Sequence, residues 1–189
     1  MLYLTVVLIS IALITGANLL FIPSPSLEAC LMMLLSVTFG AVAAFAIDGA
    51  SAFVIRRLTP ARWYESGRRI FKVSKREKNL YNKINIKAWK DRIPELGGFT
   101  GLHKDRLEST CDAEYLRRFI LESNYGVIIH VANALLGAAV AFLPFCRSPM
   151  VWVPIFAVNF ILSILPVAVL RYTVYYLERI LLRAERKMK

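Results

Sequence analysis

The sequence predicts an all-α integral membrane protein with four transmembrane helices, arranged as two hairpins that are joined by a long basic cytoplasmic segment with interfacial helices. Hydrophobic residues make up 57% of the 189 residues, and the mean hydropathy of +0.53 is too high for a soluble domain of this size. The net charge of +11 is confined to polar segments between apolar runs. This distribution favours a membrane surface over nucleic acid as the partner.

Four apolar runs are each long enough for the roughly 20 residues that a spanning helix needs. They predict spans near residues 2–22, 30–54, 125–145 and 150–170 of one membrane domain, 1–189. Short connections that contain proline and serine follow the first and third spans, and they predict the two hairpins. A cleaved signal peptide is the rival interpretation of the first run, and the absence of a basic n-region disfavours it.

The positions of the basic residues predict the orientation of the spans. Between Arg56 and Arg118 lie 17 of the 24 Lys and Arg residues, six more lie from Arg171 onward, and only Arg147 lies on the other side. The positive-inside rule therefore places the segment 57–121 and the tail 172–189 in the cytoplasm, together with the N-terminus.

Three stretches outside the spans have helical patterns. Residues 70–86 mix apolar residues with lysines and are expected to lie in the interface, with Phe71, Val73, Leu80, Tyr81 and Ile84 toward lipid. Residues 112–121 are expected to form a helix that enters the third span. The tail, 172–189, is expected to be a short amphipathic helix. Its lipid-facing side carries the tyrosines with Leu177, Ile180 and Leu181, and its basic side carries Arg179, Arg183 and Arg186.

The three cysteines are Cys30, Cys111 and Cys146. Cys30 and Cys146 are expected at the outer ends of the second and third spans, where a disulfide can form in an oxidising exterior. We favour the alternative that they are small buried thiols. No spacing of cysteine and histidine resembles a metal site, and no metal is expected.

The third span carries a polar face. His130 lies five residues inside it, roughly 8 Å below the cytoplasmic entry. Imidazole can take a proton from a hydroxyl near neutral pH, and a hydrogen bond to a neighbouring helix is the structural alternative. Glu122, His130 and Asn133 span an arc of about 80° on one helix face, which indicates contact with protein or a cavity. The alternative for Glu122 is an exposed carboxylate at the helix entry.

Further polar residues are expected at membrane depth in the other spans. Asp48 is expected near the level of His130, where it could orient the imidazole or pair with an arginine such as Arg56. For Asn159, together with Ser163 on the same face of the fourth span, we favour interhelical hydrogen bonding.

Proline and arginine then mark the cytoplasmic part of the fourth span. Pro166 is expected to kink the helix, and Arg171 closes it, where snorkelling to phosphates is a sufficient explanation. Small residues such as Gly40 and Gly137 are expected to allow close helix packing.

The segment Trp89-Lys90-Asp91-Arg92-Ile93-Pro94-Glu95 stands out from the rest of the long polar segment. A linker has no physical need for this combination of a tryptophan, paired charges and a turn-forming proline. Its aromatic residue suits a membrane surface. The pattern favours a membrane-embedded enzyme over a plain anchor.

Together with other motifs in the same order, this segment resembles the glycosyl-4,4'-diaponeurosporenoate acyltransferase family of small bacterial membrane proteins. The resemblance runs from about Arg57 to Arg179. The motifs that carry it are Arg57-Leu58-x-Pro60, Tyr81-x-Lys83-x-x-x-Ile86-x-x-Trp89-Lys90-Asp91-x-x-Pro94-Glu95, His103-x-x-x-Leu107, Glu122 with His130, and Asn159 to Pro166 with Arg171-Tyr172.

The resemblance implies a protein of the bacterial cell membrane that moves a fatty acyl group onto a sugar hydroxyl of a glycosylated apocarotenoid, the last step of a staphyloxanthin-like pathway. Two departures from the family pattern bear on the acceptor. Thr173 and Val174 stand where the family has Asn-Arg, and Val131 stands where it has an aromatic residue. If these residues contact the acceptor, the acceptor differs from that of the family.

We therefore hypothesise acyl transfer from acyl-CoA to a membrane lipid or glycolipid acceptor, without a further cofactor and without nucleic acid as a partner. His130 would be the general base, oriented by Glu122 or Asp48. Lys90 and Arg92 would hold the donor phosphates. The residues expected to bind substrate are Trp89, Lys90, Asp91, Arg92, Asn133, Asn159, Arg171 and Tyr172.

Two functions of other classes remain open at this point. The first is a non-enzymatic accessory or scaffold subunit, in which the amphipathic segments only stabilise a complex. The second is a small transporter subunit, which is disfavoured because the two hairpins lack matching broken helices.

Overall fold

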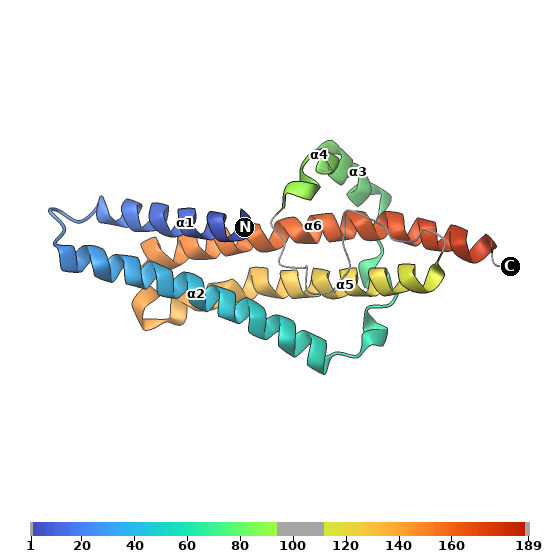
Figure 1. Cartoon of the computed structure of the whole chain (residues 1–189), viewed down its shortest axis with the longest axis horizontal. Helices are drawn as coiled ribbons and strands as arrows, with labels where there is room; N and C mark the ends of the chain where they lie inside the picture. Colours follow the sequence, from blue (N-terminus) through green and yellow to red (C-terminus); the bar gives the residue numbers. More distant parts are fainter. Residues whose placement is uncertain (1, 94–111, 188–189) are drawn as a thin grey trace. The chain divides into compact units, whose positions relative to one another are not determined.

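The computed structural model describes residues 2–93 and 112–187, and every regular element in these ranges is helical. Four helices are long and apolar enough to cross a membrane (Figure 1). They are α1 (Leu2–Leu19), α2 (Leu27–Leu58), α5 (Ala113–Leu136), which η5 (Gly137–Phe142) continues, and α6 (Pro149–Lys187). The prediction of an all-helical structure with four helices able to span a membrane is therefore confirmed, while the bounds of the spans, the two hairpins and the orientation stay predictions.

Short helices fill the described part of the long basic segment. They are η1 (Ala61–Trp63), η2 (Arg69–Phe71), α3 (Lys75–Lys83), α4 (Ile86–Trp89) and η3 (Lys90–Arg92). A further short helix, η6 (Pro144–Cys146), precedes α6. Of the residues that the sequence singled out, Pro94, Glu95, His103, Leu107 and Cys111 lie outside the described ranges.

The fourth span and the tail form one helix. α6 runs for 39 residues and passes through the buried Pro166 without interruption, so the prediction of a separate tail helix is wrong. Proline removes one backbone hydrogen bond from a helix, but packing on both sides of this position holds the helix together. Val169, Tyr172 and Val174 directly after the proline are all buried.

The chain divides into two compact units, and each is described by itself. Unit 1 comprises residues up to 53 together with 131–164, and unit 2 comprises 54–130 together with the residues from 165 onward. Three helices, α2, α5 and α6, contribute residues to both units.

The core of unit 1 is built around a close approach at Gly40. A Cβ atom added there would lie 2.7 Å from Cδ1 of Ile155 and 2.8 Å from Sγ of Cys146, so any larger residue would force these side chains to move and the predicted close packing is confirmed at this position. Cys146 is buried, and both it and Cys30 are free thiols. This arrangement supports the thiol interpretation over a disulfide. The buried core residues are Ile14, Val37, Ala44, Val140, Cys146, Val151 and Ile155.

Asn18 links α1 to the beginning of α6. Its side-chain amide donates one hydrogen bond to the carbonyl oxygen of Ile14, at 2.8 Å, and a second to that of Met150, at 2.9 Å. The residue four positions after Met150 is Pro154, which has no N–H to donate. The Met150 carbonyl therefore lacks its helical partner, and the buried Asn18 supplies one.

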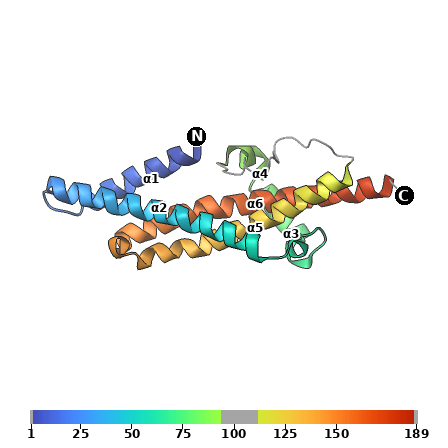
Figure 2. The same cartoon turned by 60° about the horizontal axis from the view of Figure 1, so that its bottom comes forward.

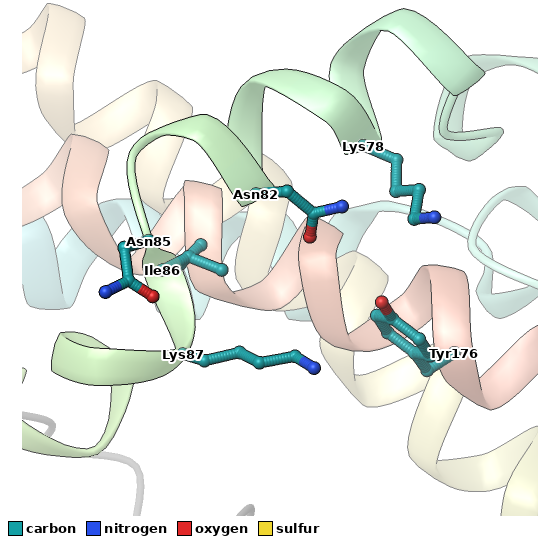
Figure 3. Close-up of a pocket in the computed structure, with 6 residues that line it drawn as sticks. All are labelled: Lys78, Asn82, Asn85, Ile86, Lys87 and Tyr176. Atoms are coloured by element: carbon teal, nitrogen blue, oxygen red, sulfur yellow. The ribbon is translucent and has the colours of Figure 1, made fainter.

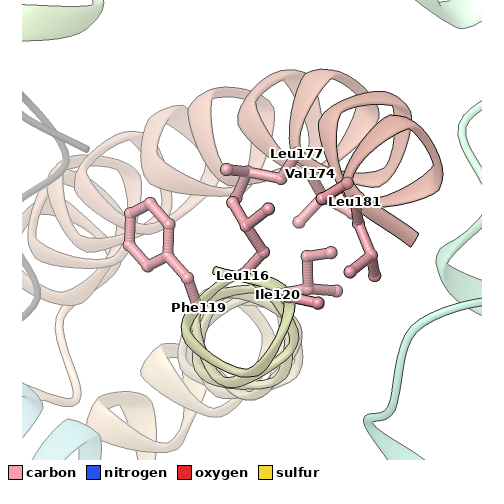
Figure 4. Close-up of a cluster of buried hydrophobic side chains, with 8 residues drawn as sticks. Leu116, Phe119, Ile120, Val174, Leu177 and Leu181 are labelled. Atoms are coloured by element: carbon pink, nitrogen blue, oxygen red, sulfur yellow. The ribbon is translucent and has the colours of Figure 1, made fainter. Parts of the chain in front are cut away.

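Unit 2 contains an apolar seam between α5 and α6. The parts of the two helices that belong to this unit lie side by side in Figures 1 and 2. Figure 4 shows the side chains that meet between them. Leu177 and Leu181 were predicted to face lipid, but they are 2% and 4% exposed because α5 covers them. The amphipathic pattern was predicted correctly and its partner was not. The buried members are Ala113, Leu116, Phe119, Ile120, Val174, Leu177, Leu181 and Ala184.

The beginning of the basic segment is fixed to α5 by polar and aromatic contacts. The ring of Tyr64 stacks on that of Tyr125 at a centroid distance of 3.8 Å. The amide of the buried Asn124 donates to the Tyr64 carbonyl at 2.8 Å, and the Tyr125 hydroxyl donates to the carbonyl of Thr59 at 3.2 Å. These contacts hold the chain after α2 against α5 within unit 2.

Candidate functional site

The segment from Val73 to Ile93 packs on α6 around Tyr172. The ring of Tyr81, from α3, meets the Tyr172 ring edge-on at 6.2 Å. Ile86, which begins α4, is fully buried in the same cluster, and Trp89 is packed against it. The indole N–H of Trp89 donates to the Ile84 carbonyl at 3.0 Å. Trp89 and Tyr172, both predicted to bind substrate, thus belong to one packed assembly. Its buried members are Val73, Tyr81, Ile86, Val169 and Tyr172.

The burial of this segment differs from the predicted interfacial helix. Phe71, Val73 and Tyr81, which were expected to face lipid, are buried within the protein, whereas Leu80 and Ile84 are 55% and 45% exposed. The apolar residues of this segment therefore lie on two different faces, and only the face with the buried residues packs on protein. The exposed face remains available to lipid.

Arg171 is held by Glu77 from α3. Its Nε donates to Oε1 of Glu77 at 2.5 Å and its Nη2 donates to Oε2 at 2.9 Å. The backbone N–H of Glu77 in turn donates to the Ser74 side chain, which caps α3. This bidentate pair, rather than snorkelling to phosphates, accounts for Arg171.

Tyr81 completes this ion pair. Its hydroxyl donates to Oε1 of Glu77 at 2.6 Å. The hydrogen bonds from Arg171 are the largest cause that lowers the pKa of Glu77 below its ordinary value. Burial, followed by the hydrogen bond to Glu77, raises the pKa of Tyr81 to about 12. The three side chains therefore form one charge-balanced group that ties α3 to α6.

The charged residues of the Trp-Lys-Asp motif lie on the surface. Lys90 forms an ion pair with its neighbour Asp91, with 2.5 Å between Nζ and Oδ1, and both Asp91 and Arg92 are exposed. The Lys90 charge thus already has a partner. Phosphate binding by Lys90 and Arg92 stays a prediction.

A cavity of about 370 Å³ lies between α3, α4 and α6 in unit 2 (Figure 3). Its lining residues are Lys78, Asn82, Asn85, Ile86, Lys87 and Tyr176. This site was not predicted, because the density of lysines was its only signal in the sequence. The cavity depends on a turn at Asn85, which adopts the left-handed conformation with φ 50°, and asparagine is among the few residues that tolerate it.

A larger cavity of about 730 Å³ lies elsewhere in unit 2. Charges of both signs line it, including Glu65, Glu114, Glu178 and Glu185 with Lys72, Arg117 and Arg118. This mixture gives no preference for an anionic ligand.

On α5, Glu122 is bound by Arg56. The two are 2.8 Å apart, between Nη2 and Oε2, and the Arg56 guanidinium lies over the Tyr125 ring at 5.3 Å. The expected pairing of Arg56 with Asp48 is therefore not the one that forms. Eight residues of continuous helix separate Glu122 from the half-buried His130, which corresponds to roughly 12 Å along the axis. Glu122 is thus positioned to hold Arg56 rather than to touch the imidazole directly.

In unit 1, the polar residues predicted at membrane depth form one cluster. The amide of Asn159 donates to the Asn133 carbonyl at 3.1 Å and also interacts with the carboxylate of Asp48. The Ser51 hydroxyl contacts Oδ1 of Asn133 and the Asp48 carbonyl. Oδ1 of Asp48 is buried and has no hydrogen-bond partner within the described ranges. Glycine at position 137 is required here, because a Cβ there would collide with the Asn159 amide.

The cluster brings together three residues that the sequence singled out and one that it did not. Asp48, Asn133 and Asn159 were each recognised as polar groups inside apolar runs. Ser51 was missed because serine is common in membrane helices, where its hydroxyl usually bonds to the preceding turn of its own helix.

The departures from the family pattern differ in exposure. Val174 is 1% exposed in the seam between α5 and α6, so it cannot contact an acceptor. The Thr173 hydroxyl bonds to the carbonyl of Val169 in its own helix. Val131, by contrast, is 37% exposed, so an acceptor could reach it.

Comparison with known proteins gives one family. The model of the family described as glycosyl-4,4'-diaponeurosporenoate acyltransferase matches residues 60–183, a range that contains every described element from η1 to η6 and most of α6. Neither the curated proteins nor the solved structures give a match. Within the described residues, no group of three His, Cys, Asp or Glu side chains is placed to hold a metal ion.

Proposed function

Because the chain belongs to the glycosyl-4,4'-diaponeurosporenoate acyltransferase family, we propose that it moves a fatty acyl group from an acyl thioester to a hydroxyl of a glycosylated lipid at the cytoplasmic membrane face. The observation that carries the proposal is the extent of the family match, residues 60–183. It covers the basic segment, α5 and most of α6. The acceptor of the family is a glycosyl apocarotenoid, and we propose a glycolipid of this kind for this chain.

His130 is the proposed general base. Its neutral imidazole would take the proton of the acceptor hydroxyl as the oxygen attacks the thioester carbonyl, and the thiolate would leave and recover that proton. His130 is half-buried on α5, a position that supports access from a lipid-embedded acceptor. The Arg56–Glu122 pair joins α2 to α5 at a position N-terminal to His130 on α5 and would position the entry to this region.

Asp48 is the alternative base. Its carboxylate has a buried oxygen without a hydrogen-bond partner in the part of the chain that the structure describes. An unpartnered oxygen of this kind is costly unless a ligand or a proton satisfies it. Asn133 and Asn159, which surround it in unit 1, would then fix its orientation.

The charge distribution supports the proposed membrane face. The elements that carry the basic residues, α3, α4, η3 and the end of α6, all belong to unit 2. By the positive-inside rule they would face the cytoplasm, where acyl-CoA is available. The termini would lie on the same side of the bacterial cell membrane.

The test is transfer of labelled acyl groups from acyl-CoA into extracted membrane lipids, in membranes that carry the wild-type chain. A new acylated glycolipid is expected. His130→Ala is expected to lower the rate by about 100-fold or more, as loss of a general base does. Asp48→Asn distinguishes the alternative base, and Lys75→Gln, a change at an exposed residue of α3, is the control. Full activity of His130→Ala at normal expression would exclude His130 as the base.

An accessory subunit without enzymatic activity would give the opposite result in this transfer assay. Wild-type membranes would then give no label above background when sugar-lipid acceptors are supplied, and one stoichiometric partner would copurify with the chain. Flux across proteoliposomes would identify the transporter alternative.

A further inference from the structure

We infer that the cavity between α3, α4 and α6 is a phosphate-binding site, and, resting on the proposed function, that the phosphates it holds are those of the coenzyme-type acyl donor. Two lysines and two asparagines line it, and among the residues that the structure describes no carboxylate does. Its volume of about 370 Å³ lies at the lower end of the range typical of small-molecule sites. A single small ion would not fill such a space.

Local geometry explains how the donors converge. Lys78 and Asn82 are four residues apart in α3 and therefore share a helix face. The left-handed turn at Asn85 then reverses the chain, so that Lys87 from α4 lies on the same side. Ile86, fully buried against α6, anchors this turn. In Figure 3 the amine ends of both lysines extend toward the side where Tyr176 lies.

Two described carboxylates that are close in sequence to the lining residues already have other partners. Within the described ranges, the nearby Glu77 is bound by Arg171 and Tyr81, and Asp91 is paired with Lys90. In the same part of the chain, neither Lys78 nor Lys87 forms an ion pair. The contact made by Lys78 is with the Tyr175 ring, at 5.9 Å. Among the residues that the structure describes, no carboxylate therefore competes with an anion for these two ammonium groups.

The donor set matches a polyanion with several oxygens. Each ammonium has three N–H donors, each asparagine amide has two, and the Tyr176 hydroxyl has one. Charged donors form the stronger hydrogen bonds to phosphate oxygens, and the neutral donors add direction. A diphosphate or a phosphate ester offers enough acceptors to use them together, whereas a single carboxylate offers two oxygens.

Two sources can supply this chemistry, and the experiment separates them. The full chain is placed in nanodiscs of neutral phosphatidylcholine, and binding of coenzyme A, which has no acyl group to transfer, is measured by calorimetry. In a second arm the nanodiscs contain phosphatidic acid, and retention of that lipid is measured by native mass spectrometry. Both arms compare the wild-type chain with the variant Lys78→Gln/Lys87→Gln.

The matched control is the variant Lys75→Gln/Lys83→Gln. It removes the same charge from two exposed positions of α3 that do not line the cavity. The cavity variant is expected to weaken coenzyme A binding by about tenfold or more, as loss of charged donors does, and the control by about twofold or less. A further pair of single variants changes only Lys87. Lys87→Glu is expected to weaken coenzyme A binding more than Lys87→Gln.

The outcomes separate the two sources and the two proposals. Lysine-dependent binding of coenzyme A supports the donor as the source. Lysine-dependent retention of phosphatidic acid without coenzyme A binding keeps a phosphate site but overturns the donor assignment. Equal effects of the cavity and control variants in both arms overturn the site. Because binding is measured without turnover, a failure of acyl transfer in the wild-type chain would remove the proposed function and leave this result intact.

Discussion

Arg171 and Glu77 form a two-point ion pair across 94 residues of sequence, with Nε to Oε1 at 2.5 Å and Nη2 to Oε2 at 2.9 Å. Their side chains are 19% and 24% exposed, so water screens the pair only partly. The pair connects α6, just after the apolar part of the fourth span, to the first turn of α3. It therefore fixes the segment that carries the Trp-Lys-Asp motif onto a membrane helix.

Breaking this pair is expected to destabilise unit 2. Arg171→Gln should lower the free energy of unfolding by about 1–3 kcal/mol, because it leaves the half-buried Glu77 without its charged donors. Thermal unfolding in detergent measures the change. The control is Arg117→Gln, which removes a partner of Glu185 from a pair in which the arginine is 58% exposed, where a loss of about 0–1 kcal/mol is expected. Equal losses in both variants would contradict the importance assigned to Arg171.

The same pair predicts a dependence of stability on pH. Arg171 holds the pKa of Glu77 below the ordinary glutamate value of 4.5, so the folded state binds this proton less readily than an unfolded chain. The stabilisation is present in full above that value and is lost as the pH falls below it, through the folded pKa. The free energy of unfolding should therefore fall more steeply for the wild-type chain than for Glu77→Gln as the pH is lowered from about 6 to about 3. Parallel curves would show that Glu77 contributes nothing to the acid response.

Gly137 is expected to resist even the smallest substitution. In Gly137→Ala the new methyl group would displace the Asn159 amide and break its hydrogen bond to Asn133. The expected loss is about 1–3 kcal/mol of unfolding free energy, measured in detergent. Gly49→Ala is the matched control, because a Cβ added at Gly49 meets nothing within 4 Å. If the two alanine variants are equally stable, the polar cluster does not depend on the space at Gly137.

The turn at Asn85 tests whether the backbone or the side chain shapes the phosphate cavity. Its φ of 50° is unfavourable for a β-branched residue, so Asn85→Val should cost about 1–2 kcal/mol, whereas Asn85→Gly should be nearly neutral. Protease sensitivity of the segment and thermal unfolding are the measurements. Equal tolerance of valine and glycine would mean that the turn is not held in this conformation.

The orientation of the spans can be tested by labelling. In a chain without native cysteines, a cysteine in place of the exposed Arg147 is expected to react with a membrane-impermeant maleimide in intact cells. A cysteine in place of the exposed Lys87 is expected to react only after the membrane is opened. The reverse pattern would invert the topology and place the phosphate cavity outside the cell.

The class of fold could be predicted from the sequence because its signals are long and redundant. Each span is an apolar run that a bilayer requires to be helical. The continuity of the fourth span with the tail could not be predicted, because Arg171 ends the apolar run, and the packing of α6 against α5 and α3 beyond that residue is visible only in the structure. The apolar face that contains Leu177 and Leu181 could be predicted, but its partner could not. An apolar helix face has the same sequence pattern whether it contacts α5 or lipid.

The residues of the candidate site that could be predicted are those whose type is unusual at their position in the sequence. Asp48, Asn133 and Asn159 are conspicuous because polar groups in a bilayer are rare. Lys78 and Lys87 are not conspicuous among many lysines, and their convergence depends on the conformation of one residue, Asn85. Periodicity cannot reveal such a turn, because it breaks the period.

The hydrogen bond from Asn18 to Met150 also has a consequence for the order of events during synthesis. The two residues are 132 positions apart, and at ordinary translation rates roughly 7–26 seconds separate their emergence from the ribosome. During that interval the second amide hydrogen of Asn18 has no Met150 carbonyl to bind, although α1 is already complete. Until the fourth span is made, this amide hydrogen has to find another acceptor, so the first helix completes its hydrogen bonds only after the last one has been synthesised.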